Sequence, residues 1–359
     1  MSPTVQVKFF TSFEEYQIPD TILVLPTNLK RLGLSEVVHH FLNLEQRIPF
    51  QFLINKEILS TSIQEYVEEN NLSTENVLLI EYMPADTPPE EKDCILHDDW
   101  ISALKVTEKY YITGCYDGQI YVWDKNNSLV AKEIVHKKPI KCIDVFDDGG
   151  SILIVSGSLD RTISVNRFSH GKIERVFVGI GHKNSIYSIA SGCFDSTIGI
   201  WSVYDDSYNK DVITVEKKKV QAKSCVTFME GHKDAVTQAC DVAFLNIVQS
   251  PFEPHWLASG HADGIIRIWN PLDKESVLYK KLPSNSPMNF ALAWKPDNQF
   301  VLCAGSYDGS VRTFDLRHPK ECLFIVKSAA EDDKVFVCEF DGNDLLFGGE
   351  AKKLNIFSN

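Results

Sequence analysis

One short pattern recurs along this 359-residue chain from residue 97 onward. An Asp that opens a tight turn is followed, six residues later, by a large side chain, with alternating apolar residues between them. Five copies begin at Asp117, Asp160, Asp195, Asp263 and Asp308, and a sixth, at 351–357, lacks the Asp. Asp commonly starts tight turns, and alternating Ile and Val residues are typical of strands. The pattern therefore predicts a series of antiparallel β units.

These repeats resemble those of the WD40 family. Gly-His dipeptides precede two of them, and the bare histidines His97 and His136 precede two others. The resemblance implies an all-β propeller of four-stranded blades, in which the recurrent polar and aromatic side chains form a structural network and not a catalytic triad. The residues expected in this network are Asp117, Trp123, Asp160, His182, Asp195, Trp201, His232, Asp263, Trp269 and Asp308. Asn166 and Phe314 replace the large Trp, and Ala351 replaces the turn Asp, which should weaken these blades.

The number of blades stays open at this point. Successive turns lie 35 to 68 residues apart, whereas the usual WD40 period is about 40–45. Six repeats can be recognised, and the family resemblance given below favours seven blades, with the third to fifth eroded. The last repeat ends at Phe357, so we expect a segment before the first repeat, such as Cys94–Leu96, to supply its outer strand.

The first 84 residues follow a different pattern. An apolar stripe predicts a helix over 33–42 with Ser35 as its N-cap, and Ser62 and Glu65 have the spacing of a capping box. Alternating apolar residues predict strands at 5–9, 21–25, 50–54 and 76–83. This order of elements resembles the ubiquitin-like β-grasp, an α+β fold.

The chain is therefore expected to contain two domains. The ubiquitin-like module takes residues 1–84, a linker with the closing strand takes 85–96, and the WD40 propeller takes 97–359. Three prolines between Pro84 and Lys92 predict a semi-stiff spacer.

The last strand of the module holds the candidate docking residues. Its alternation places Leu78, Ile80 and Tyr82 on one side of the sheet and Val77, Leu79 and Glu81 on the other. An exposed Glu at a strand end needs no function. The same pattern also fits a docking face with a central carboxylate, and the residues alone leave both interpretations open.

Composition and charge exclude several classes of protein. The net charge of −13 disfavours charge-driven binding to DNA or anionic lipid. Residues 1–92 hold 6 Lys and Arg against 14 Asp and Glu, so the module together with the start of the linker carries −8 of this charge. The nine scattered cysteines and the absence of a secretory signal indicate reduced thiols. Phosphate loops, zinc-protease motifs and nucleophile elbows are missing, so we expect no enzyme, cofactor or intrinsic metal.

A ubiquitin-like module followed by a WD40 propeller is similar to one family in particular, the WD-repeat ribosome biogenesis factor of the PeBoW complex, or Ytm family. The stretches that carry this resemblance are Leu29–Val38, Pro49–Ile54, Leu59–Ser62 and His97–Ser102. It implies a scaffold that joins the Block-of-proliferation protein, and through it Pescadillo, on precursors of the large (60S) ribosomal subunit in the nucleolus and nucleoplasm. The alternatives are a Notchless-type assembly factor and a WD40 substrate receptor of a ubiquitin ligase.

The same resemblance implies a role for Glu81. In that family the module is gripped by the MIDAS domain of midasin, an AAA ATPase, and a Glu of the module completes the coordination of a divalent ion held there. The matching residue is Glu81, with Val77, Leu79 and Tyr82 as the docking face. The ion, expected to be Mg²⁺, belongs to the partner.

A basic run lies between the third and fourth repeats. It consists of Lys217, Lys218 and Lys219. A nuclear localisation signal, an RNA contact and an ordinary solvated loop all fit such a run, and the sequence leaves the three open.

Overall fold

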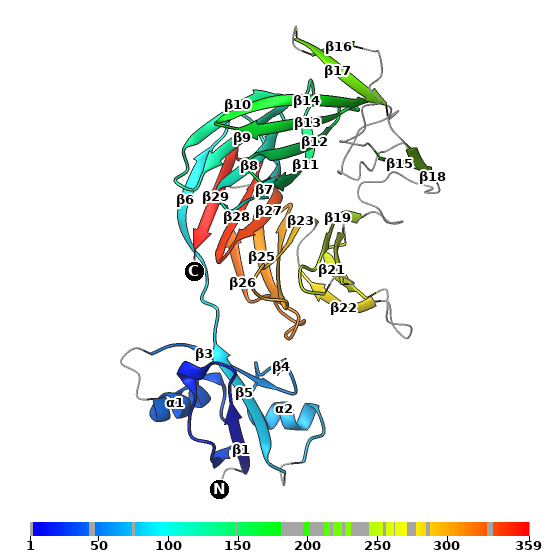
Figure 1. Cartoon of the computed structure of the whole chain (residues 1–359). Helices are drawn as coiled ribbons and strands as arrows, with labels where there is room; N and C mark the ends of the chain where they lie inside the picture. Colours follow the sequence, from blue (N-terminus) through cyan, green and yellow to red (C-terminus); the bar gives the residue numbers. More distant parts are fainter. Residues whose placement is uncertain are drawn as a thin grey trace. The chain divides into compact units, whose positions relative to one another are not determined.

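The computed structural model divides the chain into two compact units, Met1–Pro88 and Pro89–Asn359 (Figure 1). The division falls inside the expected linker. Among the described residues no helix is both long and apolar enough to cross a membrane. The residues that the structure describes are 3–42, 47–73, 76–147, 149–180, 197–200, 212–215, 218–224, 227–230, 244–253, 256–261, 263–270, 278–284, 288–328 and 333–358.

The first unit is a five-stranded mixed sheet with two helices. Its central strand β5 (Leu78–Pro84) pairs in parallel with β1 (Thr4–Phe10) and antiparallel with β3 (Phe50–Ile54), and the sheet order is β2-β1-β5-β3-β4. The other elements are β2 (Ile22–Pro26), β4 (Glu57–Ile58), α1 (Arg31–Leu42), α2 (Ile63–Glu69) and a 3₁₀ turn at Glu14–Tyr16. The predicted α+β β-grasp is confirmed.

One helix start was predicted correctly and the other was wrong. Glu65 N donates to Ser62 Oγ (3.2 Å) and Ser62 N donates to Glu65 Oε2 (3.0 Å), which is the predicted capping box at α2. Helix α1 begins at Arg31, so Ser35 lies inside it and is not its N-cap. The side chain of Ser35 contacts His39 one turn later, at 3.4 Å between Oγ and Nδ1.

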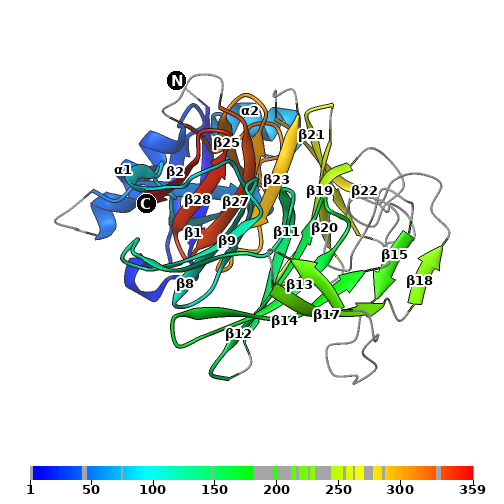
Figure 2. The ribbon, with the colours of Figure 1, turned by 90° about the horizontal axis from the view of Figure 1, so that it is seen from above.

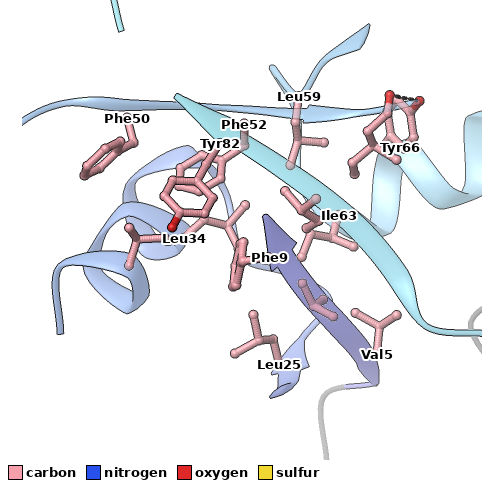
Figure 3. Close-up of a cluster of buried hydrophobic side chains, with 14 of the residues drawn as sticks. Val5, Phe9, Leu25, Leu34, Phe50, Phe52, Leu59, Ile63, Tyr66 and Tyr82 are labelled. Carbon is pink, nitrogen blue, oxygen red and sulfur yellow. Dashed lines mark hydrogen bonds between the residues drawn. The ribbon is translucent and has the colours of Figure 1, made fainter. Parts of the chain in front are cut away.

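Both helices of the module pack on the same face of the sheet. Leu34 of α1 and Ile63 of α2 join the buried residues of β1, β3 and β5 in one hydrophobic core (Figure 3). Tyr82 lies in this core, where its hydroxyl donates to the Tyr16 carbonyl (2.5 Å) and accepts from Ile18 N (3.2 Å). The opposite face of the sheet carries no helix among the described residues.

The second unit is a series of mainly antiparallel sheets, four of which have four strands. The first four-stranded sheet contains β7 (Ile101–Val106), β8 (Tyr110–Cys115), β9 (Gln119–Asp124) and β10 (Leu129–Ile134). Two more consist of β19 (Phe244–Gln249), β20 (Leu257–His261), β21 (Ile265–Trp269) and β22 (Leu278–Pro283), and of β23 (Asn289–Trp294), β24 (Val301–Ser306), β25 (Ser310–Asp315) and β26 (Phe324–Lys327). The last contains β27 (Val335–Asp341), β28 (Asp344–Gly349), β29 (Lys353–Ser358) and β6 (Glu90–Leu96).

The sheet that follows β10 in the chain is wider than these four and has six strands. Its strands β11 (Ile140–Asp147), β12 (Ile152–Ser158), β13 (Ile163–Ser169) and β14 (Lys172–Ile180) are extended by a hairpin of β16 (Val212–Val215) and β17 (Lys218–Ser224). Strand β17 pairs in parallel with β14. A separate pair is formed by β15 (Thr197–Ile200) and β18 (Thr227–Glu230). No sequence pattern predicted the added hairpin.

Neighbouring sheets contact one another through their first strands. Strand β7 packs beside β11 and β27, and β23 packs beside β27 and β19 (Figures 1 and 2). The faces between these sheets are filled with apolar side chains, for example Ile112 and Val122 of one sheet against Ile140 and Ile154 of the next. This arrangement confirms the propeller blades. The choice between six and seven blades concerns residues 181–243, most of which lie outside the described ranges.

The last blade is completed by a strand that precedes the first repeat, as predicted. Strand β6 pairs antiparallel with β29, with Ile95 opposite Leu354 and Cys94 opposite Asn355. Ile95 is 3% exposed and packs in the core shared by the first and last blades, whereas its neighbour Leu96 is 68% exposed. The pairing therefore joins two segments that are far apart in the sequence.

This pairing predicts unequal effects for two adjacent substitutions. Ile95→Ala should lower the free energy of unfolding of the propeller by about 3 kcal/mol, because it leaves a cavity in a closed apolar core. Leu96→Ala is the matched control and should change it by less than about 0.5 kcal/mol. Urea unfolding of the full chain measures both. Equal effects would contradict the role assigned to β6.

Candidate functional site

Strand β5 separates core residues from surface residues by its alternation. Ile80 and Tyr82 point into the hydrophobic core. Leu79 is 55% exposed, Val77 just before the strand is exposed, and Glu81 is partly exposed. The predicted division of the strand into two faces therefore holds for these residues.

Tyr82 corrects one part of the predicted docking face. It was expected on that face, but it is 1% exposed and contacts the rings of Phe9 and Phe50 in the core. Side chains alternate along a strand, so a residue next to Glu81 must face the other side of the sheet. Tyr82 supports the site from beneath and cannot contact a partner on the helix-free face.

Three further apolar side chains extend this face across the sheet. They are Phe10 of β1 and Ile22 and Val24 of β2, and all three are exposed, Val24 by 64%. We call Phe10, Ile22, Val24, Val77 and Leu79 the open apolar face. An exposed cluster of large apolar side chains on one side of a sheet is typical of an interaction surface.

The strand register arranges these residues in rows around Glu81. Glu81 pairs with Phe10 on β1 and with Leu53 on β3. In the adjacent row, Lys8 of β1 lies between Ile22 of β2 and Leu79 of β5. Glu81 thus occupies the central strand, with apolar neighbours on both sides. Phe10, Ile22 and Val24 were not predicted for this face, although the run of apolar residues at 22–25 is a signal that both faces of β2 are apolar.

The charges on this face favour an available carboxylate. Lys8 Nζ lies 2.9 Å from Asp20 Oδ1, so this lysine already has an acidic partner. Within the described residues of the module, no hydrogen bond or ion pair engages the side chain of Glu81. A partly exposed carboxylate in an apolar surround is suited to bind a cation that a partner presents.

The predicted WD40 residues of the first blade form a structural network. Trp123 Nε1 donates to His97 Nε2 at 3.2 Å, and His97 Nε2 lies 2.8 Å from Thr113 Oγ1. The other ring nitrogen, Nδ1, lies 3.3 Å from the Ile95 carbonyl. Asp117 accepts from the Tyr121 hydroxyl at 2.8 Å. Burial lowers the pKa of His97 to about 4, so the ring is neutral at pH 7.

The second blade has a related network with one replacement. His136 Nδ1 lies 3.1 Å from Asp160 Oδ2, and His136 Nε2 lies 3.0 Å from Ser156 Oγ. Burial alone would raise the pKa of Asp160, but the bonds from His136 and Thr162 hold it at about 2. Asn166, in place of the large Trp, is buried and accepts from Ser164 Oγ at 3.2 Å.

Two later blades repeat this structural use of the motif. In one, Trp269 Nε1 donates to Ser259 Oγ at 2.6 Å, and Arg267 forms an ion pair with Asp263, also at 2.6 Å. In the next, Asp308 binds Arg312 at 2.7 Å, and burial of Phe314 fills the position of the missing Trp. These groups bind one another within their blades, as the WD40 resemblance implies.

Several predicted residues lie outside the described ranges. They are His182, Asp195, Trp201, His232 and Lys217. Lys218 and Lys219 lie on β17, in the hairpin that extends the second blade. The three interpretations of this basic run therefore stay predictions. In the described part of the chain, no group of three or more His, Cys, Asp or Glu residues could hold a metal ion.

The chain is similar to known proteins along its whole length. A model of the NLE (NUC135) domain matches residues 5–67, and a model of the WD domain, G-beta repeat, matches 92–124, 128–165, 223–270 and 284–315. A protein from Nematostella vectensis named Ribosome biogenesis protein WDR12 homolog is 28% identical over 98% of this chain and 99% of its own length. The predicted resemblance to the Ytm family is confirmed.

Other relatives of this family have similar coverage. Ribosome biogenesis protein YTM1 of Eremothecium gossypii is 26% identical over 99% of this chain and 98% of its own length. The WDR12 homolog of Arabidopsis thaliana is 26% identical over 100% of this chain and 97% of its own length. The matched NLE range ends before β5, so the role of Glu81 stays a prediction that rests on the strand and its surroundings.

The buried neutral ring of His97 predicts a pH dependence of stability. An unfolded His binds its proton near pH 6.5, whereas the folded pKa is about 4. The unfolded state therefore binds more protons between these values, and stability is lost as the pH falls from 6.5 towards 4. At pH 5 the loss from this residue should be about 2 kcal/mol relative to pH 7.5.

Urea unfolding of the full chain at pH 7.5 and pH 5 measures this loss. The difference between the two pH values should shrink in His97→Asn and stay at the wild-type size in His170→Gln, since His170 is exposed in the turn after β13. An undiminished difference in His97→Asn would show that another group causes it.

Proposed function

We propose that this chain is a non-enzymatic scaffold in the biogenesis of the large ribosomal subunit. Support comes from the full-length relatives, which are named ribosome biogenesis proteins, and from the paired NLE and WD40 matches. In this proposal the propeller joins the Block-of-proliferation protein, which carries Pescadillo, on the precursor particle. The chain works in the nucleolus and nucleoplasm and needs no cofactor of its own.

The module, in the same proposal, docks on the MIDAS domain of midasin through Glu81. The observation that carries this step is the position of Glu81 on the central strand, between Phe10 and Leu53 and next to the exposed Leu79. Mg²⁺ prefers carboxylate oxygens and retains water in open positions. An apolar rim that closes around the bound carboxylate excludes competing water, which strengthens the charge-assisted contact.

The net charge of the module and the start of the linker suits this partner. Residues 1–92 carry −8, and a negative field accelerates the encounter with a site that presents a cation. The single contact that orients the complex is then Glu81, and the open apolar face supplies the area around it.

The fold of the module is also suited to transmit a mechanical force that a partner applies at Glu81. Glu81 is part of β5, which is bonded to β1 on one side and to β3 on the other, and Ile80 and Tyr82 anchor the strand in the core. A force applied at this carboxylate is carried by the central strand of the sheet and not by a loop. We propose that midasin uses this attachment to remove the scaffold from the maturing particle.

The metal contact predicts the behaviour of a substitution that preserves size. Glu81→Gln should weaken binding of the full chain to the midasin MIDAS domain at least about tenfold in the presence of Mg²⁺, because an amide oxygen is a poorer ligand than a carboxylate. Chelation of Mg²⁺ should weaken the wild type to the same level and leave the variant unchanged. Calorimetric titration measures both effects.

Glu36→Gln is the matched control, since Glu36 is exposed on α1 and faces away from the open apolar face. It should bind as the wild type does. If neither Glu81→Gln nor the chelator weakens the affinity for the MIDAS domain, the proposed metal contact is wrong. Glu81→Gln should still capture the Block-of-proliferation protein, and a loss of that capture would contradict the division of roles between module and propeller.

The open apolar face generates a separate prediction. Leu79→Ala should weaken binding to the MIDAS domain about fivefold, because it removes apolar area that is buried only in the complex. Leu32→Ala removes an equally large, exposed side chain from α1 and should have no effect. The same titration measures both, and thermal melts of the full chain should be unchanged. Equal affinities for the two variants would show that the partner does not cover this face.

A further inference from the structure

A short acceptor motif lies in the segment that joins the two folded units along the chain. Residues 85–89, between β5 and β6, form neither helix nor strand. Thr87 is exposed in the middle of this segment and is followed directly by Pro88 and Pro89. A threonine followed by proline is the pair that proline-directed protein kinases recognise in their substrates.

The two prolines favour an extended chain around Thr87. The ring of Pro88 disfavours the helical region for the residue before it, and Pro89 does the same for Pro88. Kinase active sites bind the residues around the acceptor in an extended form, so this segment enters such a site without the loss of a helix or strand. Pro88 also has no backbone N–H, so a kinase pocket that accepts proline leaves no donor unpaired.

The hydroxyl of Thr87 is accessible and makes no contact that a phosphate would displace. In the part of the chain that the structure describes, no hydrogen bond or ion pair engages its side chain. The module holds the chain up to Ala85, whose N donates to the Pro49 carbonyl at 2.8 Å. The propeller holds it again from β6, where Lys92 Nζ lies 3.0 Å from Asp344 Oδ2. Thr87 therefore lies between two anchored points of the chain.

Ser250 has the same kind of motif in a different setting. It precedes Pro251 but is only 3% exposed. Its Oγ accepts from Phe252 N at 3.3 Å and from Glu253 N at 3.2 Å, so the hydroxyl organises the turn after β19. A kinase reaches this hydroxyl only after the turn opens. The fold therefore separates two acceptor motifs that look alike in the sequence.

The charges around Thr87 narrow the class of kinase. Asp86 precedes it, and Glu90 occupies the third position after it. Kinases that select a basic residue at this third position, as cyclin-dependent kinases do, carry a negative pocket there, and that pocket repels Glu90. Proline-directed kinases of the mitogen-activated type have no such requirement and fit this segment.

We propose that Thr87 is a phosphorylation site for a proline-directed kinase of the mitogen-activated type. The kinase transfers the γ-phosphoryl group of ATP. A bond forms between Thr87 Oγ1 and the γ-phosphorus, the bond from this phosphorus to the oxygen that bridges to the β-phosphorus breaks, and ADP leaves. The hydroxyl proton passes to the catalytic aspartate of the kinase.

The phosphate changes the linker and neither folded unit. It adds a charge of about −1.5 to −2 at pH 7 to a segment that already holds Asp86 and Glu90. Like charges along a linker repel one another and extend it. The cores of the module and the propeller contain no residue of 85–89, so their stability should stay unchanged. The proposal does not depend on the metal contact at Glu81.

Phosphorylation of the full chain by a purified, activated mitogen-activated protein kinase with MgATP tests the proposal. Mass spectrometry of the phosphopeptides measures the occupancy of each Ser and Thr over time. Thr87 should reach nearly full occupancy while Ser250 stays at least about tenfold lower, because phosphorylation of Ser250 requires local opening of its turn. Ser2 and Ser286 also precede proline and lie outside the described ranges, and the same spectra measure their occupancy separately.

Two adjacent prolines supply a matched pair of variants. Pro88→Ala keeps the acceptor but removes the residue that directs the kinase, so the initial rate at Thr87 should fall at least about tenfold. Pro89→Ala removes the neighbouring proline and keeps the Thr-Pro pair, so its rate should stay within about twofold of the wild type. Thermal melts of the phosphorylated and unmodified chains should agree within about 2 °C.

Three results would overturn the proposal. The first is a Thr87 that stays unmodified while a standard peptide substrate in the same reaction is fully converted. The second is an equal rate at Thr87 in Pro88→Ala and the wild type. The third is a clear shift of the melting temperature on phosphorylation, since the phosphate would then act on a folded unit. None of these measurements involves midasin, so failure here is distinct from failure of the proposed function.

Discussion

The pairing of β6 with β29 is the interaction on which the propeller depends. The first and last blades pack apolar faces against each other in one shared core. Strand β6 comes from the start of the propeller, yet it completes the sheet of the last repeat and places Ile95 in the core between the two. Ring contacts cross this same junction, because Trp100 and Tyr116 of the first blade contact Phe336 of the last.

In the module, the corresponding constraint is the alternation of side chains along β5. One face of this central strand supplies Ile80 and Tyr82 to the core, and the other presents Leu79 and Glu81. The helices cover only the first face, which leaves the second for a partner. The carboxylate is thus held on the central strand, which pairs with β1 on one side and with β3 on the other.

Much of this architecture could be predicted from local patterns. The turn Asp and the large residue six positions later mark each blade, and the capping box at Ser62 marks α2. Other features had no local signal. Helix α1 starts four residues before the expected Ser35, Arg161 and Lys352 adopt a positive φ at turns where other blades use Gly, and a hairpin widens the second blade through β17. The hairpin depends on its pairing with β14, which is distant from β17 in the sequence.

From the sequence, turn spacing and strand alternation predicted the two domain types and the closing segment, because these are local properties. The structural use of the WD40 residues and Glu81 as the candidate contact were implied by the family resemblance. Only the tertiary structure decided which side chains surround these positions. Tyr82 proved to be a core residue, whereas Phe10, Ile22 and Val24 joined Leu79 on the open apolar face. The physical reason is that a face of a sheet, or the end of a row of blades, is made from strands that come together only when long-range pairing fixes their order and register.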